Sequence, residues 1–127
     1  MQEKHLFEYA VIRVVPRVER EEFQNVGVIL FCKAQSFLKV IFDLNEMKLN
    51  AVYKGLDLID IKDRLHAFEH ICGGEPQGGA IGRMAAAERF RWLTSTRSTI
   101  IQTSAVHPGM CVDAEATLLR LFNQLVL

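Results

Sequence analysis

The fold is decided by one stretch, Glu22-Phe23-Gln24-Asn25-Val26-Gly27-Val28-Ile29-Leu30-Phe31, in which a polar lead-in turns into an apolar run. The β-branched, aromatic and leucine side chains of the run fit the pleated surface of a strand. Both alternating sides are apolar, which predicts a strand covered on both faces. Gly27 interrupts the run and predicts either a β-bulge or the close approach of another backbone segment. The polar residues before Gly27 either simply begin the strand or line a polar pocket whose floor is the Gly27 backbone.

Two neighbouring stretches flank this strand, which we expect to run over residues 25–33. Residues 7–15 predict a strand before it, ended by Pro16 because proline has no N–H to donate to a sheet. Residues 37–43 alternate between apolar and polar side chains, which is typical of a half-buried strand, and Lys39 marks it as a protected edge. Since short connections join the three strands, we expect an antiparallel meander.

The second half of the chain predicts helices and one more strand. Residues 99–103 favour a fourth strand, and Pro108-Gly109 a turn. The fold class is therefore α+β, with an antiparallel sheet of three to four strands packed by three to four helices. Four segments carry apolar residues at helical spacing: a short one ending near Gly55, one capped by Asp57 or Asp60 and ending at Cys72, one over residues 84–93, and one capped by Asp113.

Length and composition place the chain among small globular proteins. Its 127 residues predict a single domain, 1–127, with a flexible glycine-rich loop at 73–82. Fifteen basic residues balance fifteen acidic ones, which argues against bulk electrostatic capture of nucleic acid or of an anionic membrane. The sequence contains neither an apolar run of membrane-spanning length nor a signal-like N-terminus. Three widely spaced cysteines fit free buried thiols, so we expect a reduced, cytoplasmic protein.

Polar residues at predicted strand ends and in loops form the main candidate site. Two arginines, an amide and a histidine have the chemistry to hold a phosphate or a carboxylate. A buried structural network is the alternative, in which Glu22 would neutralise Arg13. The candidate ligand-binding residues are Arg13, Glu22, Asn25, Arg97, Ser98 and His107.

Three weaker patterns point to other chemistry. His66, Glu69 and His70 match the H-x-x-E-H pattern of zinc peptidases, but they lie away from the apolar stripe of their helix and lack a convincing third ligand. We therefore assign no metal, no cofactor and no catalytic residue. Cys111, near the start of the last helix, is either an activated thiol or a small apolar filler. A basic and aromatic cluster suggests nucleic-acid binding, which overall neutrality disfavours; its members are Arg83, Arg89, Phe90, Arg91, Trp92 and Arg97.

Several short motifs occur in an order that is similar to one bacterial family. They are Tyr9-x-x-Ile12-Arg13-x-x-Pro16, Glu22-x-x-Asn25-Val26-Gly27-Val28, Arg89-Phe90-Arg91-Trp92-Leu93, Arg97-Ser98-Thr99 and His107-x-Gly109. The chain resembles domain of unknown function 3037 over nearly its whole length, with Thr96 standing where the pattern has a proline. The resemblance implies no activity to carry over. Because members are often encoded beside proteins resembling toxin-type serine/threonine kinases, it implies an accessory role with a kinase-like partner.

These observations favour a non-enzymatic accessory or protein-interaction module. The alternative is binding, or hydrolysis, of a small phosphate- or carboxylate-bearing ligand near Arg13, Asn25 and Arg97. Association of the chain with itself, through an edge strand or an apolar face, is left open.

Overall fold

Strand β1 (His5–Arg17) lies at the centre of the sheet and pairs along both of its edges. β2 (Glu22–Cys32) pairs with one edge, and β3 (Phe37–Phe42) pairs with β2. β4 (Ile101–Thr103) and β5 (His107–Cys111) share the other edge of β1. All of these pairings are antiparallel, so the predicted meander and the α+β class are confirmed.

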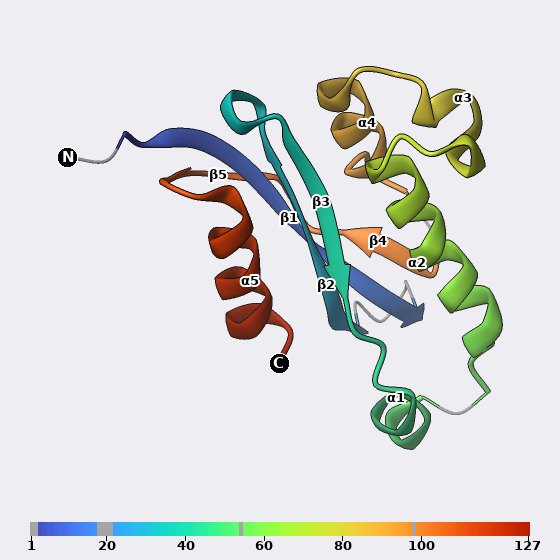
Figure 1. Cartoon of the computed structure of the whole chain (residues 1–127). Coiled ribbons are helices and arrows are strands. Elements are labelled where there is room, and N and C mark those ends of the chain that lie inside the picture. The colour runs from blue at the N-terminus through green and yellow to red at the C-terminus, as the bar shows by residue number, and fades with distance from the viewer. Residues whose placement is uncertain (1–2, 18–21, 54, 98) are drawn as a thin grey trace.

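The computed structural model describes residues 3–17, 22–53, 55–97 and 99–127, and within them the sheet has five strands. Figure 1 shows α5 against one face of this sheet and α2 and α4 against the other. No helix in the described ranges is long and apolar enough to cross a membrane. The helices are α1 (Glu46–Val52), α2 (Leu58–Cys72), α3 (Gly79–Gly82), α4 (Ala86–Leu93) and α5 (Ala114–Leu125), with short 3-10 turns η2 (Lys33–Gln35) and η3 (Pro76–Gly78).

Alternation along β1 divides the hydrophobic core into two layers. Ala10, Ile12 and Val14 are fully buried and belong to the layer under α2 and α4. Phe7, on the opposite side of the strand, packs with the residues under α5. Because successive strand residues point to opposite faces, the register of β1 decides which helix layer each of its side chains meets.

Gly27 combines both features that its position predicts. The partners Ile12–Gly27 and Arg13–Asn25 leave Val26 as the extra residue of a β-bulge. A Cβ on Gly27 would also lie 2.7 Å from the carbonyl oxygen of Ile41, on β3, so the close approach of β3 requires a glycine here.

The structure differs from the sequence prediction at two prolines, Pro16 and Pro108, which both lie within strands. Pro16 does not end the first strand, because a register shift between Val14 and Arg17 places it where the ladder is already irregular. The predicted turn at Pro108-Gly109 is wrong, since both residues belong to β5. β5 accepts them because, in the described residues, it pairs with β1 alone, and the ring of Phe7 covers the bare backbone of Gly109.

The glycine-rich segment is more regular than the predicted flexible loop. Much of it forms η3 and α3, and Arg89 holds its start. The Arg89 guanidinium donates from Nη1 to the carbonyls of Ile71 (2.8 Å) and Cys72 (2.7 Å), and from Nε to that of Met84 (2.9 Å). These carbonyls include two at the end of α2, where a cation also opposes the helix dipole.

Of the two caps predicted for α2 and α5, the first is confirmed, and in the second another residue supplies the capping hydrogen bond. Asp57 caps α2, its side chain accepting from the N–H of Asp60 at 3.0 Å. Asp113 occupies the cap position of α5, but its side chain makes no capping hydrogen bond. Gln35, just before β3, takes that role: its Oε1 accepts from the N–H of Ala114 (2.8 Å) and its Nε2 donates to the carbonyl of Val112 (2.6 Å).

Replacing Gln35 should therefore weaken the protein more than replacing Asp113. Gln35→Ala should lower the free energy of unfolding by about 1 kcal/mol, the usual cost of a lost N-cap. Asp113→Ala is the matched control. It removes only the favourable charge near the helix N-terminus and should lower the free energy of unfolding by a few tenths of about 1 kcal/mol. Urea unfolding followed by circular dichroism measures both, and an Asp113→Ala cost equal to or above that of Gln35→Ala would contradict the assignment.

Candidate functional site

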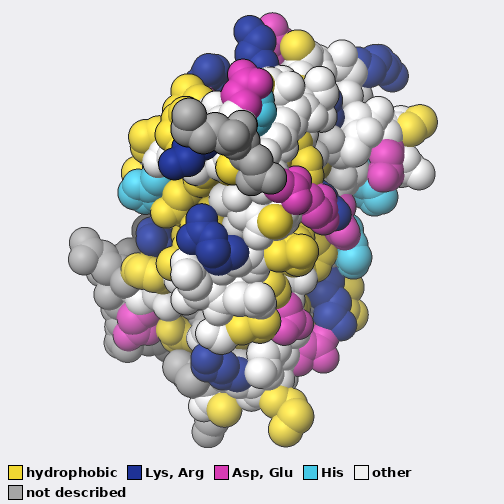
Figure 2. All heavy atoms as spheres, turned by 60° about the vertical axis from the view of Figure 1, so that its left-hand side comes forward, with side chains coloured by type: hydrophobic (Ala, Val, Ile, Leu, Met, Phe, Trp, Pro, Cys, Tyr) yellow, Lys and Arg dark blue, Asp and Glu magenta, His cyan; other side chains and the backbone are white. Residues whose placement is uncertain are grey.

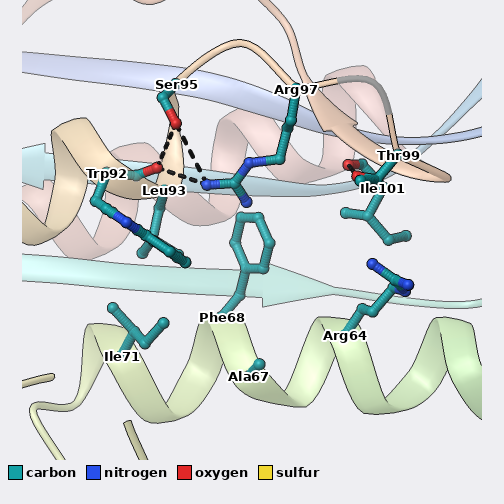
Figure 3. A pocket seen from close by; sticks show the side chains of 10 residues that line it. All are labelled: Arg64, Ala67, Phe68, Ile71, Trp92, Leu93, Ser95, Arg97, Thr99 and Ile101. Carbon is teal, nitrogen blue, oxygen red and sulfur yellow. Dashed lines mark hydrogen bonds between the residues drawn. The ribbon is translucent and has the colours of Figure 1, made fainter. Parts of the chain in front are cut away.

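A cleft opens between α2, α4 and the segment that leads into β4. Its volume is about 470 Å³, within the range typical of small-molecule sites. Its walls are mostly apolar, with two guanidinium groups and two hydroxyl-bearing residues at the rim (Figure 3). The lining residues are Arg64, Ala67, Phe68, Ile71, Trp92, Leu93, Ser95, Arg97, Thr99 and Ile101.

Arg97 is the polar residue at the centre of this cleft. Its Nη2 donates to the carbonyl of Trp92 (2.6 Å) and approaches the hydroxyl of Ser95 (3.4 Å). The guanidinium carbon lies 4.8 Å from the centre of the Trp92 ring and 5.8 Å from that of Phe68 (Figure 3). Aromatic faces attract cations, so these contacts hold the guanidinium over the cleft.

Burial lowers the pKa of Arg97, because the surrounding apolar groups penalise its charged form. Among the described residues, no carboxylate forms an ion pair with this guanidinium. A partly desolvated cation without a counter-charge gains most from an added anion.

The other polar groups of the cleft are already engaged locally. Arg64 donates from Nε to Asp60 one turn earlier on α2 (3.0 Å) and stays exposed. The hydroxyls of Ser95 and Thr99 donate to backbone carbonyls. The cleft lining includes no His, Asp, Glu or Cys, and its polar groups are the two guanidinium groups and the hydroxyls of Ser95 and Thr99.

Two of the predicted site residues, Arg13 and Asn25, are brought together away from this cleft. They are direct partners across β1 and β2. The Asn25 Nδ2 donates to the carbonyl of Leu125 at the end of α5 (3.0 Å), and Arg13 alternates with residues that pack under α2 and α4. Arg13 and Asn25 therefore belong to the α5 side of the sheet, whereas Arg97 contacts Phe68 of α2 on the opposite side.

Glu22 and His107 do not join either group. Glu22 is exposed and forms no ion pair with Arg13, whose guanidinium instead lies 4.1 Å from the centre of the Phe23 ring. His107 is exposed at the start of β5, its ring 5.4 Å from that of Tyr9. Ser98 lies outside the described residues. The five described candidates are thus spread over separate places, with Arg13 and Asn25 adjacent and Arg97 on the opposite side of the sheet.

Asn25 has a small hollow of its own. About 280 Å³ in volume, the hollow lies between the start of β2, α1 and the end of the chain. The Oδ1 of Asn25 and the Nε of Arg13 are buried with no hydrogen-bond partner in the described structure. A polar pocket with the Gly27 backbone as its floor was one of two alternatives; the hollow lies beside Asn25, and Gly27 is not among its lining residues.

Phe68 and Trp92 are the cleft residues that sequence reasoning placed elsewhere. Phe68 was grouped with the apolar stripe of its helix, and Trp92 with a basic cluster. The sequence does hold one usable signal: Arg64 and Phe68 are four residues apart, so they share a helix face and line one wall together.

The H-x-x-E-H residues separate into two pairs. The Nδ1 of His66 lies 2.7 Å from Glu69, and that of His70 lies 2.7 Å from Glu75, beyond the end of α2. In the ranges that the structure describes, no three His, Cys, Asp or Glu side chains come close enough to hold a metal ion.

The thiols behave as buried apolar side chains. Cys32, Cys72 and Cys111 are all free and buried. Burial raises the pKa of Cys72 to about 12, although nearby Arg89 opposes the shift, and burial with Cys32 as neighbour raises the pKa of Cys111. Of the two interpretations of Cys111, the structure therefore favours the apolar filler.

One known protein family matches almost the whole chain. A family model described as "Protein of unknown function (DUF3037)" matches residues 9–126, from the middle of β1 to the end of α5. The chain belongs to this family. The DUF3037 match thus includes every element that builds the Arg97 cleft. No curated protein matches the chain, and no solved structure does either.

Proposed function

We propose that this DUF3037 protein is a non-enzymatic binding module whose cleft at Arg97 receives a small molecule with a carboxylate or phosphate group and an apolar body. The observation that carries the proposal is the guanidinium of Arg97, partly desolvated, held over two aromatic rings and without a carboxylate partner among the described residues. An anion there replaces the hydration that the guanidinium loses on burial.

The shape and lining of the cleft define the rest of the ligand. Phe68, Leu93 and Ile101 give an apolar floor, which favours a flat or aliphatic body over a bare inorganic ion. Arg64, exposed at the rim, exchanges its bond to Asp60 for a second contact with the anion at little cost, because exposed ion pairs contribute little. Binding without turnover fits a lining with no His, Asp, Glu or Cys, in which the hydroxyls of Ser95 and Thr99 donate to backbone carbonyls.

The test is thermal unfolding with aromatic carboxylates and phosphates, such as indole-3-carboxylate and phenyl phosphate. A specific ligand at 100 times its dissociation constant stabilises the fold by about 2.7 kcal/mol. Arg97→Gln should remove about half or more of this stabilisation, since a lost charge-assisted hydrogen bond costs about 1.5–3 kcal/mol. Arg13→Gln, on the other side of the sheet, is the matched control and should keep it. A panel without any shift, or a shift that Arg97→Gln retains, would contradict the proposal.

We propose the accessory role as a second function, supported by an exposed apolar corner at the start of α1 and α2. Met47 on α1 is 85% exposed and Ile59 on α2 is 75% exposed. An ion pair between Glu46 and Lys62 ties the two helices together at this corner. Large exposed hydrophobic side chains on adjoining helices are a common feature of protein-binding surfaces.

Co-expression with a serine/threonine kinase-like protein, the kind of partner that the family resemblance implies, tests this role. Met47→Glu combined with Ile59→Glu should abolish co-purification. Leu119→Glu, which changes an exposed leucine on α5, should leave it intact. Loss of co-purification with Leu119→Glu alone, or its persistence in the double variant, would rule this corner out as the docking surface.

A further inference from the structure

One end of the sheet is covered on a single face. At this end Leu6 of β1 and Met110 of β5 are direct partners, 60% and 57% exposed. Their neighbours Phe7 and Cys111, which point to the other face, are each only 5% exposed under α5. Alternation puts Leu6 on the same face as Ala10, the face that α2 and α4 cover further along the sheet. We name Leu6 and Met110 the open strip.

A groove of about 600 Å³ runs from the open strip to the wall formed by α4. Its floor includes Phe31, which is buried and stacked on Phe90 of α4 with ring centres 5.6 Å apart, so the floor is firmly packed. Its α4 wall presents Ala87, a small residue that allows close approach of another element. The groove is therefore an apolar, preformed surface beside a helix, with space in the helical layer.

The charges around this groove have both signs. Glu8 belongs to β1, Lys33 to the turn η2 and Arg91 to α4. Within the described residues, none of the three forms an ion pair. An isologous interface requires a patch that is complementary to itself, and a patch with apolar residues at its centre and charges of both signs around them meets this condition.

We propose that the open strip and its groove are the contact surface for a second copy of this chain, forming a two-fold symmetric dimer. The α4 helix of each copy packs against the open strip of the other, and Glu8 of each copy meets Arg91 of the other. The neutral chain adds no long-range repulsion to this contact. Figure 2 brings forward the left-hand side of Figure 1, where α5 lies, and on that face basic, acidic and hydrophobic side chains are interspersed. The proposal does not depend on the ligand at Arg97, whose cleft has no lining residue in common with the groove.

Sedimentation velocity of the full chain, from low micromolar to submillimolar concentration, tests the dimer. The wild type should dimerise reversibly, and Leu6→Glu with Met110→Glu should weaken dimerisation by about tenfold or more. Leu119→Glu, equally a charge on an exposed leucine but located on α5, should not. Because the substituted side chains are more than half exposed in the strip, circular dichroism should report an unchanged fold.

A charge exchange distinguishes specific dimerisation through this surface from nonspecific hydrophobic association. Glu8→Arg and Arg91→Glu should each weaken the dimer, and the two together should restore it, because each copy then offers the reversed pair. A monomer throughout the concentration range, a dimer that the strip variants leave unchanged, or a double exchange that fails to restore association would each overturn the proposal. A kinase-like protein that binds only through the open strip would also overturn it.

Discussion

Burial of the middle of β1 on both faces, together with pairing along both of its edges, is the constraint on which the rest of the structure depends. This strand joins β2 on one side and β4 and β5 on the other, and three of its residues are completely buried under α2 and α4. Each buried N–H and carbonyl of such a strand needs a partner. Where β4 and β5 leave a gap, Ser104 fills it: its hydroxyl accepts from the N–H of Val11 (2.9 Å), and its own N–H donates to the Val11 carbonyl (2.8 Å).

The same alternation separates the polar groups into distinct places. Arg13 lies on the α5 side and is covered by Phe23, while Arg97 lies on the α2 side between two aromatic rings. A sheet with a core on each face cannot bring both guanidinium groups to one ligand. Among the described residues Arg97 also has no carboxylate partner, and this isolation is the basis of the binding role that we propose for the cleft.

Much of the fold could be predicted from local patterns, because those patterns reflect local physics. The double-sided apolar run after Gly27, the Asp57 cap and the spacing of α2 all correspond to short-range preferences. The predictions failed where a distant residue decides the outcome. Pro108-Gly109 forms a strand because Phe7 covers the glycine, and α5 is capped by Gln35, 79 positions before Ala114.

Single residues of the candidate site could be predicted from the sequence, but not which of them lie together. The sequence places Arg97 both in the main candidate site and in the basic, aromatic cluster, but its partners depend on how distant elements pack. Gly27 predicts the bulge beside it, whereas the break between β4 and β5 is not visible in a list of residue types. Phe68 and Trp92 therefore entered the site only through the packing of α2 beside α4.

Native-state hydrogen exchange of the β1 amides tests the central role of this strand most directly. If β1 is the doubly paired core, the amides of Ala10 to Val14 should exchange only through global unfolding and be the slowest in the chain, while those of the short strand β4 exchange faster. Exchange of the β1 amides by local opening, at rates equal to those of Ile101 to Thr103, would contradict the central place given to β1 and the separation of the two faces derived from it.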